Sequence, residues 1–102
     1  INFGIAVTFY QLGNLAEAIS ILENTFEKDK KGGYPHYLGI IHEQINENKK
    51  AINFYIQSAE LRRERLGEYH PNTKESVSNV MKLSNKCPLV KIPKWIKELN
   101  DQ

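Results

Sequence analysis

The sequence has a single cysteine among its 102 residues, so Cys87 can form neither an internal disulfide nor a zinc cluster built on thiols. A lone cysteine fits a reducing compartment, most simply the cytosol. No apolar run approaches the roughly 18 residues that suggest a membrane-spanning helix. The net charge of +2 is too small to indicate nucleic acid or an anionic membrane as a partner. The remaining composition is typical of a globular domain.

Motifs that carry chemistry are equally scarce. His36 and His42 lie six positions apart, whereas two ligands share one helix face at a spacing of three or four. The third histidine, His70, precedes Pro71 and is expected to fix a turn by hydrogen bonding. We find no glycine-rich phosphate loop and no recognisable setting for a nucleophile. We therefore predict that the chain is not an enzyme and holds no cofactor and no metal.

What the sequence does contain is an internal repeat. Residues 9–19 align with residues 42–52, a shift of 33 residues. Self-similarity at this period indicates an array of stacked units. Each unit is predicted to be a helix, a tight turn and a second helix, which buries its apolar face only against its neighbours. This pattern favours a binding module over an enzyme.

Hydrophobic periodicity and helix breakers place the elements. We expect helices over residues 1–12, 15–29, 35–45, 46–66 and 71–85, and a short helix over 93–100. Pro35 is expected as the first residue of its helix, and Asn46 as the start of the next. Gly32 and Gly33 are interpreted as a helix stop, and Gly67 as a residue with a left-handed backbone after a helix end.

Capping and burial patterns add detail at both ends of the chain. Asn14 with Glu17, and Asn72 with Glu75, have the spacing of capping boxes. The first helix is apolar on nearly every position, so it should be buried on all sides.

We expect residue 1 to be an internal point in a longer protein, and the array to fall short of the roughly three units needed for a self-sufficient monomer. Residues 86–102 should form a degenerate capping segment, with Trp95, Ile96 and Leu99 covering the fifth helix.

Two sets of small, aromatic and polar residues follow one frame. They are Ile5, Ala6, Phe9, Gly13, Ala18, Leu22 and Thr25 in the first unit, and Leu38, Gly39, His42, Asn46, Ala51, Tyr55 and Ser58 in the second. This frame resembles the tetratricopeptide repeat. The stretch 61–73, with its Leu-Gly-x-x-His-Pro pattern, is similar to the longer repeats of kinesin light chains. The resemblance implies an all-α solenoid of antiparallel helix pairs, with repeats at 1–33 and 34–70 and a half repeat at 71–85.

The resemblance also implies where small residues and partners belong. Ala6, Ala18, Gly39 and Ala51 should lie where helices cross, with Phe9 and Tyr55 filling the space beside them. The first helices of successive units should line a concave, partner-binding face formed by Phe3, Val7, Tyr10, Gln11, His36, Ile40, Glu43, Gln44 and Lys82, with Glu75 and Ser78 beside them. A mixed apolar and polar trough of this kind suits a peptide or a helix.

The function implied is a non-catalytic scaffold or adaptor in the cytoplasm, with the cytoskeleton or a cilium as candidate settings. The alternative is a purely structural block of a longer solenoid inside a large assembly. Tetratricopeptide arrays that bind chaperone C-termini hold the terminal carboxylate with Lys, Asn and Arg. The matching positions here hold Gly4, Gly33, Tyr37, Glu75 and Asn79, so we expect no such carboxylate clamp.

Basic residues form clusters in the sequence. They are Arg62, Arg63 and Arg65, together with Lys28, Lys30, Lys31, Lys49 and Lys50. Acidic neighbours such as Glu60 and Glu64 are interleaved with them, so no stripe of a single sign is predicted. Three interpretations remain open: a solvated helix face, a site for an acidic partner segment, and a nucleic-acid surface. The first is the simplest, and no nucleic-acid partner is expected.

Overall fold

The computed structural model describes the backbone of residues 2–101 and the side chains of residues 4–101. It has six helices, with no strand between residues 2 and 101. The helices are α1 (Asn2–Gln11), α2 (Leu15–Lys28), α3 (Gly33–Gln44), α4 (Asn48–Leu66), α5 (Pro71–Ser84) and α6 (Lys94–Asn100). The prediction of an all-α chain is therefore confirmed. None of the helices between residues 2 and 101 combines the length and apolar character needed to cross a membrane.

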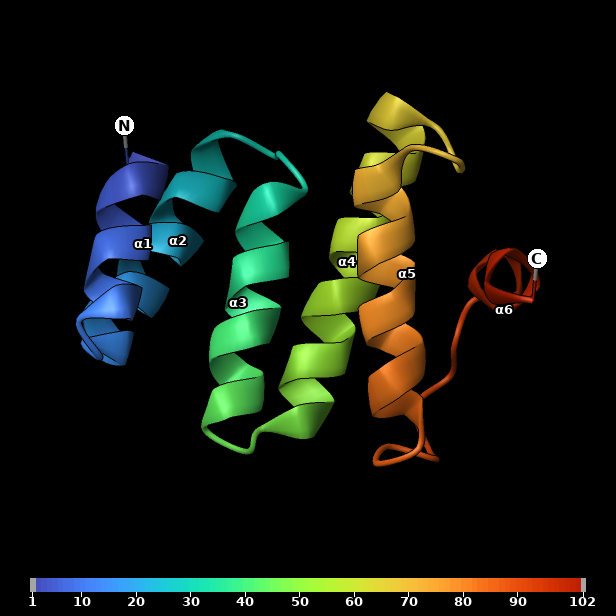
Figure 1. Cartoon of the computed structure of the whole chain (residues 1–102). Coiled ribbons are helices and arrows are strands. Elements are labelled where there is room, and N and C mark those ends of the chain that lie inside the picture. The colour runs from blue at the N-terminus through green and yellow to red at the C-terminus, as the bar shows by residue number, and fades with distance from the viewer. Residues whose placement is uncertain (1, 102) are drawn as a thin grey trace.

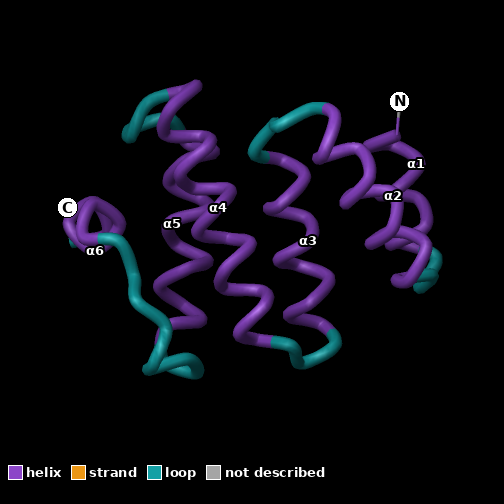
Figure 2. The backbone as a smooth tube through the Cα atoms, turned by 180° about the vertical axis from the view of Figure 1, so that it is seen from behind, coloured by secondary structure: helices purple, strands orange, loops and turns teal. Residues whose placement is uncertain are grey.

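The helices pack in chain order, each against the next. Figure 1 shows α1, α3 and α5 standing side by side in one layer, with α2 and α4 in a second layer behind them. The view from behind shows the same order, and α6 lies across the outer side of α5 (Figure 2). The result is a row of antiparallel helix pairs whose first helices all belong to the same layer.

Residues with positive φ end three of the helices. Gly13 has a φ of 82° after α1, Asn46 a φ of 63° after α3, and Gly67 a φ of 94° after α4. Glycine reaches this region without steric cost, and asparagine reaches it more readily than most residues. Gly67 has the positive φ predicted for it, with an extended ψ of 160°. Because Asn46 is left-handed, it cannot open α4, and that helix begins two residues later than predicted, at Asn48.

The prediction for the turn between α2 and α3 was wrong in detail. Gly32 has a right-handed helical φ of −64° and is the N-cap of α3, while Gly33 is the first residue of that helix. Pro35 is therefore the third residue of α3 and not the first. Its missing N–H still costs nothing, since the amides of a first turn have no partner within their own helix.

Neither predicted capping box forms. The Asn14 side chain makes no capping hydrogen bond at the start of α2. The N-cap of α5 is His70 instead of Asn72, and its Nδ1 accepts a hydrogen bond of 3.1 Å from the backbone N–H of Asn72. Pro71 follows as the first helical residue, a position that suits it. The expectation that His70 fixes this turn is confirmed, and its ring takes the role predicted for Asn72.

The small residues predicted at the helix crossings are all buried. Ala6, Ala18 and Ala51 are fully buried, and Gly39 is buried against the ring of Tyr55. A Cβ atom added to Gly39 would stand 2.7 Å from Tyr55 Cδ1, closer than real contacts allow. Glycine at this position therefore sets how closely α3 can approach α4.

Two groups of buried residues form the core. The first joins α1, α2 and α3, and the second joins α4, α5, α6 and the segment before α6. In the second group, Ile96 and Leu99 of α6 pack with Val77 and Val80 of α5, which confirms that the C-terminal segment covers the fifth helix. Trp95 is only partly buried, and the guanidinium carbon of Arg63 lies 4.5 Å from its ring centroid.

Helix α1 is not buried on all sides by this chain. Ile5 is 45% exposed and Leu12, just after the helix, is 76% exposed. The two residues are seven positions apart, which places them on the same side of the helix axis. The described part of the chain thus leaves an apolar strip along the outer side of α1.

Candidate functional site

The predicted partner-binding residues come from α1, α3 and α5, which form one layer (Figure 1). Gln11, Glu43, Gln44 and Lys82 are exposed, and Val7, Tyr10 and Ile40 are partly exposed. The side chain of Phe3 lies outside the described residues. Ser78, expected beside this set, lines a shallow hollow with Leu99 and Asn100 and so faces α6.

The structure brings several of these residues together. Gln44 Nε2 donates a 2.7 Å hydrogen bond to the Tyr10 hydroxyl, which connects α3 to α1. The Tyr10 ring also meets Tyr37 edge to face, with centroids 6.2 Å apart. Glu43 Oε1 accepts a 2.9 Å hydrogen bond from the Tyr55 hydroxyl. Burial and this bond to Glu43 raise the pKa of Tyr55, so the phenol stays protonated and remains the donor.

His36, predicted to line the partner-binding face, is buried, since only 5% of it is exposed. Its Nδ1 lies 3.4 Å from Ser76 Oγ, and its Nε2 lies 3.5 Å from Glu75 Oε1. Burial, with a further contribution from Arg62, lowers the pKa of His36 to about 4. The ring is therefore neutral at pH 7, and its contact with Glu75 is not an ion pair. His36 joins α3 to α5 from within the protein.

A directional chain of hydrogen bonds crosses the same region. Ser58 Oγ donates to the Gly32 carbonyl at 2.7 Å, so it must accept in its 3.0 Å contact with Ser76 Oγ. Ser76 in turn accepts a 2.9 Å bond from Arg62 Nη1. In the order Arg62, Ser76, Ser58, Gly32, each hydroxyl donates once, and Ser76 can only accept in its contact with His36 Nδ1. This chain ties α4 and α5 to the turn before α3.

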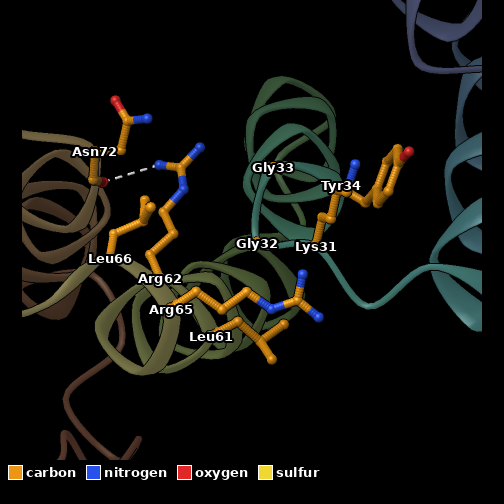
Figure 3. A pocket seen from close by; sticks show the side chains of 9 residues that line it. All are labelled: Lys31, Gly32, Gly33, Tyr34, Leu61, Arg62, Arg65, Leu66 and Asn72. Atoms are coloured by element: carbon orange, nitrogen blue, oxygen red, sulfur yellow. Dashed lines mark hydrogen bonds between the residues drawn. The ribbon is translucent and has the colours of Figure 1, made fainter.

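Arg62 stands at the start of this chain and at the edge of a pocket of about 560 Å³. The pocket is lined by Lys31, Gly32, Gly33, Tyr34, Leu61, Arg62, Arg65, Leu66 and Asn72. In Figure 3, Arg62 and Arg65 extend from α4 on one side, and Lys31 and the two glycines stand on the other. Arg62 Nη1 also donates to the Asn72 carbonyl at 2.9 Å and lies 3.5 Å from Glu75 Oε1.

Sequence reasoning missed this pocket. Its simplest interpretation of the arginines of α4 was a solvated helix face, with a site for an acidic partner segment left open, but only 12% of the Arg62 side chain is exposed. One signal was present: Ser58 and Ser76 are polar residues on otherwise apolar stripes, and both are fully buried. Buried hydroxyls need hydrogen-bond partners, so they could have indicated a polar cluster at this junction.

Other chemistry is sparse among the described residues. Between residues 4 and 101, no three or more His, Cys, Asp or Glu side chains are grouped so that they could hold a metal ion. His42 occupies a position that is usually aromatic in tetratricopeptide repeats. Its ring stacks on Phe54, with ring centroids 5.3 Å apart. Its Nδ1 lies 3.0 Å from Glu47 Oε1, and this hydrogen bond lowers the pKa of Glu47, with help from Lys50. These contacts hold the turn between α3 and α4.

Comparisons with known protein families, with curated proteins and with solved structures find no match to this chain. A functional assignment therefore rests on the geometry of the helices, of the layer formed by α1, α3 and α5, and of the basic pocket.

Proposed function

We propose that this chain is a non-catalytic protein-interaction module that binds a peptide or a helix of another protein. The observation that supports this proposal best is the common layer of α1, α3 and α5, in which the three first helices of successive pairs stand side by side (Figure 1). The residues proposed for this face include the exposed polar Gln11, Glu43 and Lys82 and the partly exposed apolar Val7 and Ile40. Apolar positions with a polar surround suit the side chains and the backbone of a bound segment.

The surface is also held in shape before any partner arrives. The bond from Gln44 to Tyr10 connects α3 to α1, and the contacts of His36 connect α3 to α5. A surface that is already ordered loses little conformational entropy on binding. This preorganisation is what a docking face for a flexible peptide requires.

We further propose that the helix pairs belong to a solenoid of the tetratricopeptide type. Three observations support this assignment: the repeat of 33 residues, the small residues at the crossings, and the common layer of first helices. A cytoplasmic scaffold or adaptor fits this assignment, and the partner would be another protein. We do not expect a carboxylate clamp of the tetratricopeptide type, because the matching positions of the first helices hold Gly4, Gly33, Tyr37, Glu75 and Asn79.

A structural role is the second candidate, and the outer side of α1 favours it. Ile5 and Leu12 form an apolar strip that the described part of this chain does not cover. Apolar strips of this kind normally meet a neighbour. In this alternative, both layers of helices are used by permanent neighbours, and no surface is reserved for a transient ligand.

The proposal can be tested with peptides selected from a random display library against the whole chain. Their affinities would then be measured for the wild type, for Lys82→Glu on the proposed face, and for Lys49→Glu at the start of α4. Both lysines are exposed, so the substitutions match in chemistry and exposure. We expect a loss of roughly tenfold, about 1.4 kcal/mol, for Lys82→Glu only. Equal effects of the two variants would contradict the proposed face.

A further inference from the structure

The pocket beside the turn between α2 and α3 concentrates positive charge. Among its nine lining residues, Lys31, Arg62 and Arg65 are cationic, and none is acidic. The nearest carboxylates are outside the lining. Glu75 lies 3.5 Å from Arg62 Nη1, and Asp29 lies 3.5 Å from Lys31 Nζ. The pair of Lys31 with Asp29 is well exposed and so is worth little, which leaves Lys31 available to a stronger anion.

Arg62 keeps donors for such an anion. Its hydrogen bonds to Asn72, Ser76 and Glu75 within residues 4–101 all use Nη1. A guanidinium has five N–H donors, so those of Nε and Nη2 remain. The bonds through Nη1 also hold the side chain in one position, so little entropy is lost when an anion binds. Figure 3 shows the second terminal nitrogen of Arg62 directed away from Asn72.

The backbone on the wall of the pocket opposite Arg62 also carries positive charge. Gly32 caps and Gly33 begins α3, whose N-terminal end carries partial positive charge. A Cβ on Gly32 would lie 2.6 Å from Arg62 Cγ, so glycine at this position brings the start of the helix close to the arginine. The helix end adds to the three cations, which are the main feature of the site.

We propose that this pocket binds the phosphoryl group of a phosphorylated side chain in another protein. A phosphoryl group carries close to two negative charges and three acceptor oxygens at pH 7, which matches cations that approach from two walls. Leu61, Leu66 and Tyr34 add apolar contact area for the chain that carries the phosphate. The volume of about 560 Å³ is within the usual range of ligand pockets, roughly 300 to 1,000 Å³.

This site is separate from the proposed face, since none of its lining residues belongs to that set. Its test is therefore independent of the proposed function. The whole chain, labelled with nitrogen-15, would be titrated with three probes: inorganic phosphate, a blocked tripeptide with phosphoserine at its centre, and the same tripeptide with glutamate. We expect the amide signals of Gly32 and Gly33 to shift most, with the phosphoserine peptide binding most tightly.

Charge variants locate the site. Arg65→Gln removes a cation that takes no part in the hydrogen bonds of Arg62, and we expect it to weaken the phosphoserine peptide roughly tenfold. Lys49→Gln, at the far end of the same helix, removes an equal charge and should leave the affinity unchanged. Equal losses in both variants, or shifts spread over all basic regions, would show general ion attraction and overturn the proposal.

The probes themselves decide the remaining alternatives. If the glutamate peptide binds as tightly as the phosphoserine peptide, the pocket accepts any acidic side chain and the phosphoryl assignment is wrong. If inorganic phosphate binds as tightly as the phosphoserine peptide, the site takes the free ion and the assignment to a protein partner is wrong.

Discussion

At the scale of single residues, Gly39 is the position where the structure most clearly requires a glycine. Tyr55 is held in place by its bond to Glu43, so its ring cannot move away from a new Cβ 2.7 Å distant. We expect Gly39→Ala to destabilise the protein by roughly 1–3 kcal/mol, although alanine is the better helix former by about 1 kcal/mol. Urea unfolding followed by circular dichroism would measure the difference.

Gly4 provides the matched control. It lies in α1, and a Cβ built on it meets no atom of the described chain within 4 Å. Gly4→Ala should therefore be neutral or stabilising by up to about 1 kcal/mol. A Gly39→Ala variant as stable as Gly4→Ala would show that α3 and α4 do not cross at this residue.

His36 gives the fold a specific sensitivity to acid. Its pKa is about 4 in the folded chain and 6.5 for a free histidine, so the unfolded state binds more protons between these values. Stability then rises with pH across this window and is lost as the pH falls. Acidification from about pH 7 to about pH 5 is expected to cost about 2 kcal/mol through this residue.

The measurement compares unfolding free energies at both pH values for the wild type and for His36→Asn. The substitution removes the titrating ring, and other groups titrate in both proteins. Arg62 and Glu75, which face the ring, are present in both as well. The wild type should lose more stability on acidification than the variant. Parallel losses would mean that His36 is accessible to solvent and protonates freely.

The sequence predicts those features of single residues that depend on nearby residues in the chain. It does not predict features that depend on contacts between distant helices. Gly39 and the alanines repeat with the period of the units, so their place at the crossings was predictable. The burial of His36 depends on α5, which lies some forty positions away along the chain, and no local pattern indicates it. The inward position of Arg62 has the same origin, because its partners Asn72 and Ser76 belong to α5.

At the scale of elements, α6 is short but closes the second core. Ile96 is fully buried against α5, whereas Leu89 in the preceding segment is 96% exposed. Ile96→Ala should therefore cost roughly 2–5 kcal/mol. Leu89→Ala removes comparable volume from the surface and should stay within about 0.5 kcal/mol of the wild type. Thermal melts that fail to separate the two variants would show that α6 does not pack on α5.

The positions of the helices were predictable from the sequence. The residues that cap their N-terminal ends were harder to predict. Glycines, prolines and apolar spacing act locally, and they placed both ends of all six helices to within two residues. The N-caps failed because a cap depends on the orientation of one side chain. Asn14 has suitable chemistry but makes no capping bond, while the ring of His70 does. Composition at a cap position does not determine that geometry.

At the scale of the whole molecule, the apolar strip on α1 predicts association. Ile5 and Leu12 lie on the same side of the helix and are both exposed. We expect the purified chain to self-associate in sedimentation experiments, and Ile5→Lys with Leu12→Lys to shift it toward the monomer. Leu89→Lys changes an even more exposed leucine elsewhere and should leave association unchanged. A wild-type chain that sediments only as a monomer would contradict this prediction.

The arrangement of the helices in layers was predictable because it follows from the sequence repeat. Because both units share a period, their first helices were expected in one layer, and they lie there (Figure 1). The basic pocket was not predictable, because Lys31 and Arg62 come from different units and meet only after the units stack. Sites between units depend on stacking geometry that no single repeat encodes.

The layer of α1, α3 and α5 is the surface that we propose binds a protein segment. Site-specific photo-cross-linking in the native cell tests it most directly, with the photoreactive residue at Gln11 on that layer or at Gln57 on α4. Both glutamines are exposed, so the two probes are equally accessible. We expect a discrete protein adduct from Gln11 and none from Gln57. An adduct from Gln57 alone, or the same adducts from both positions, would contradict it.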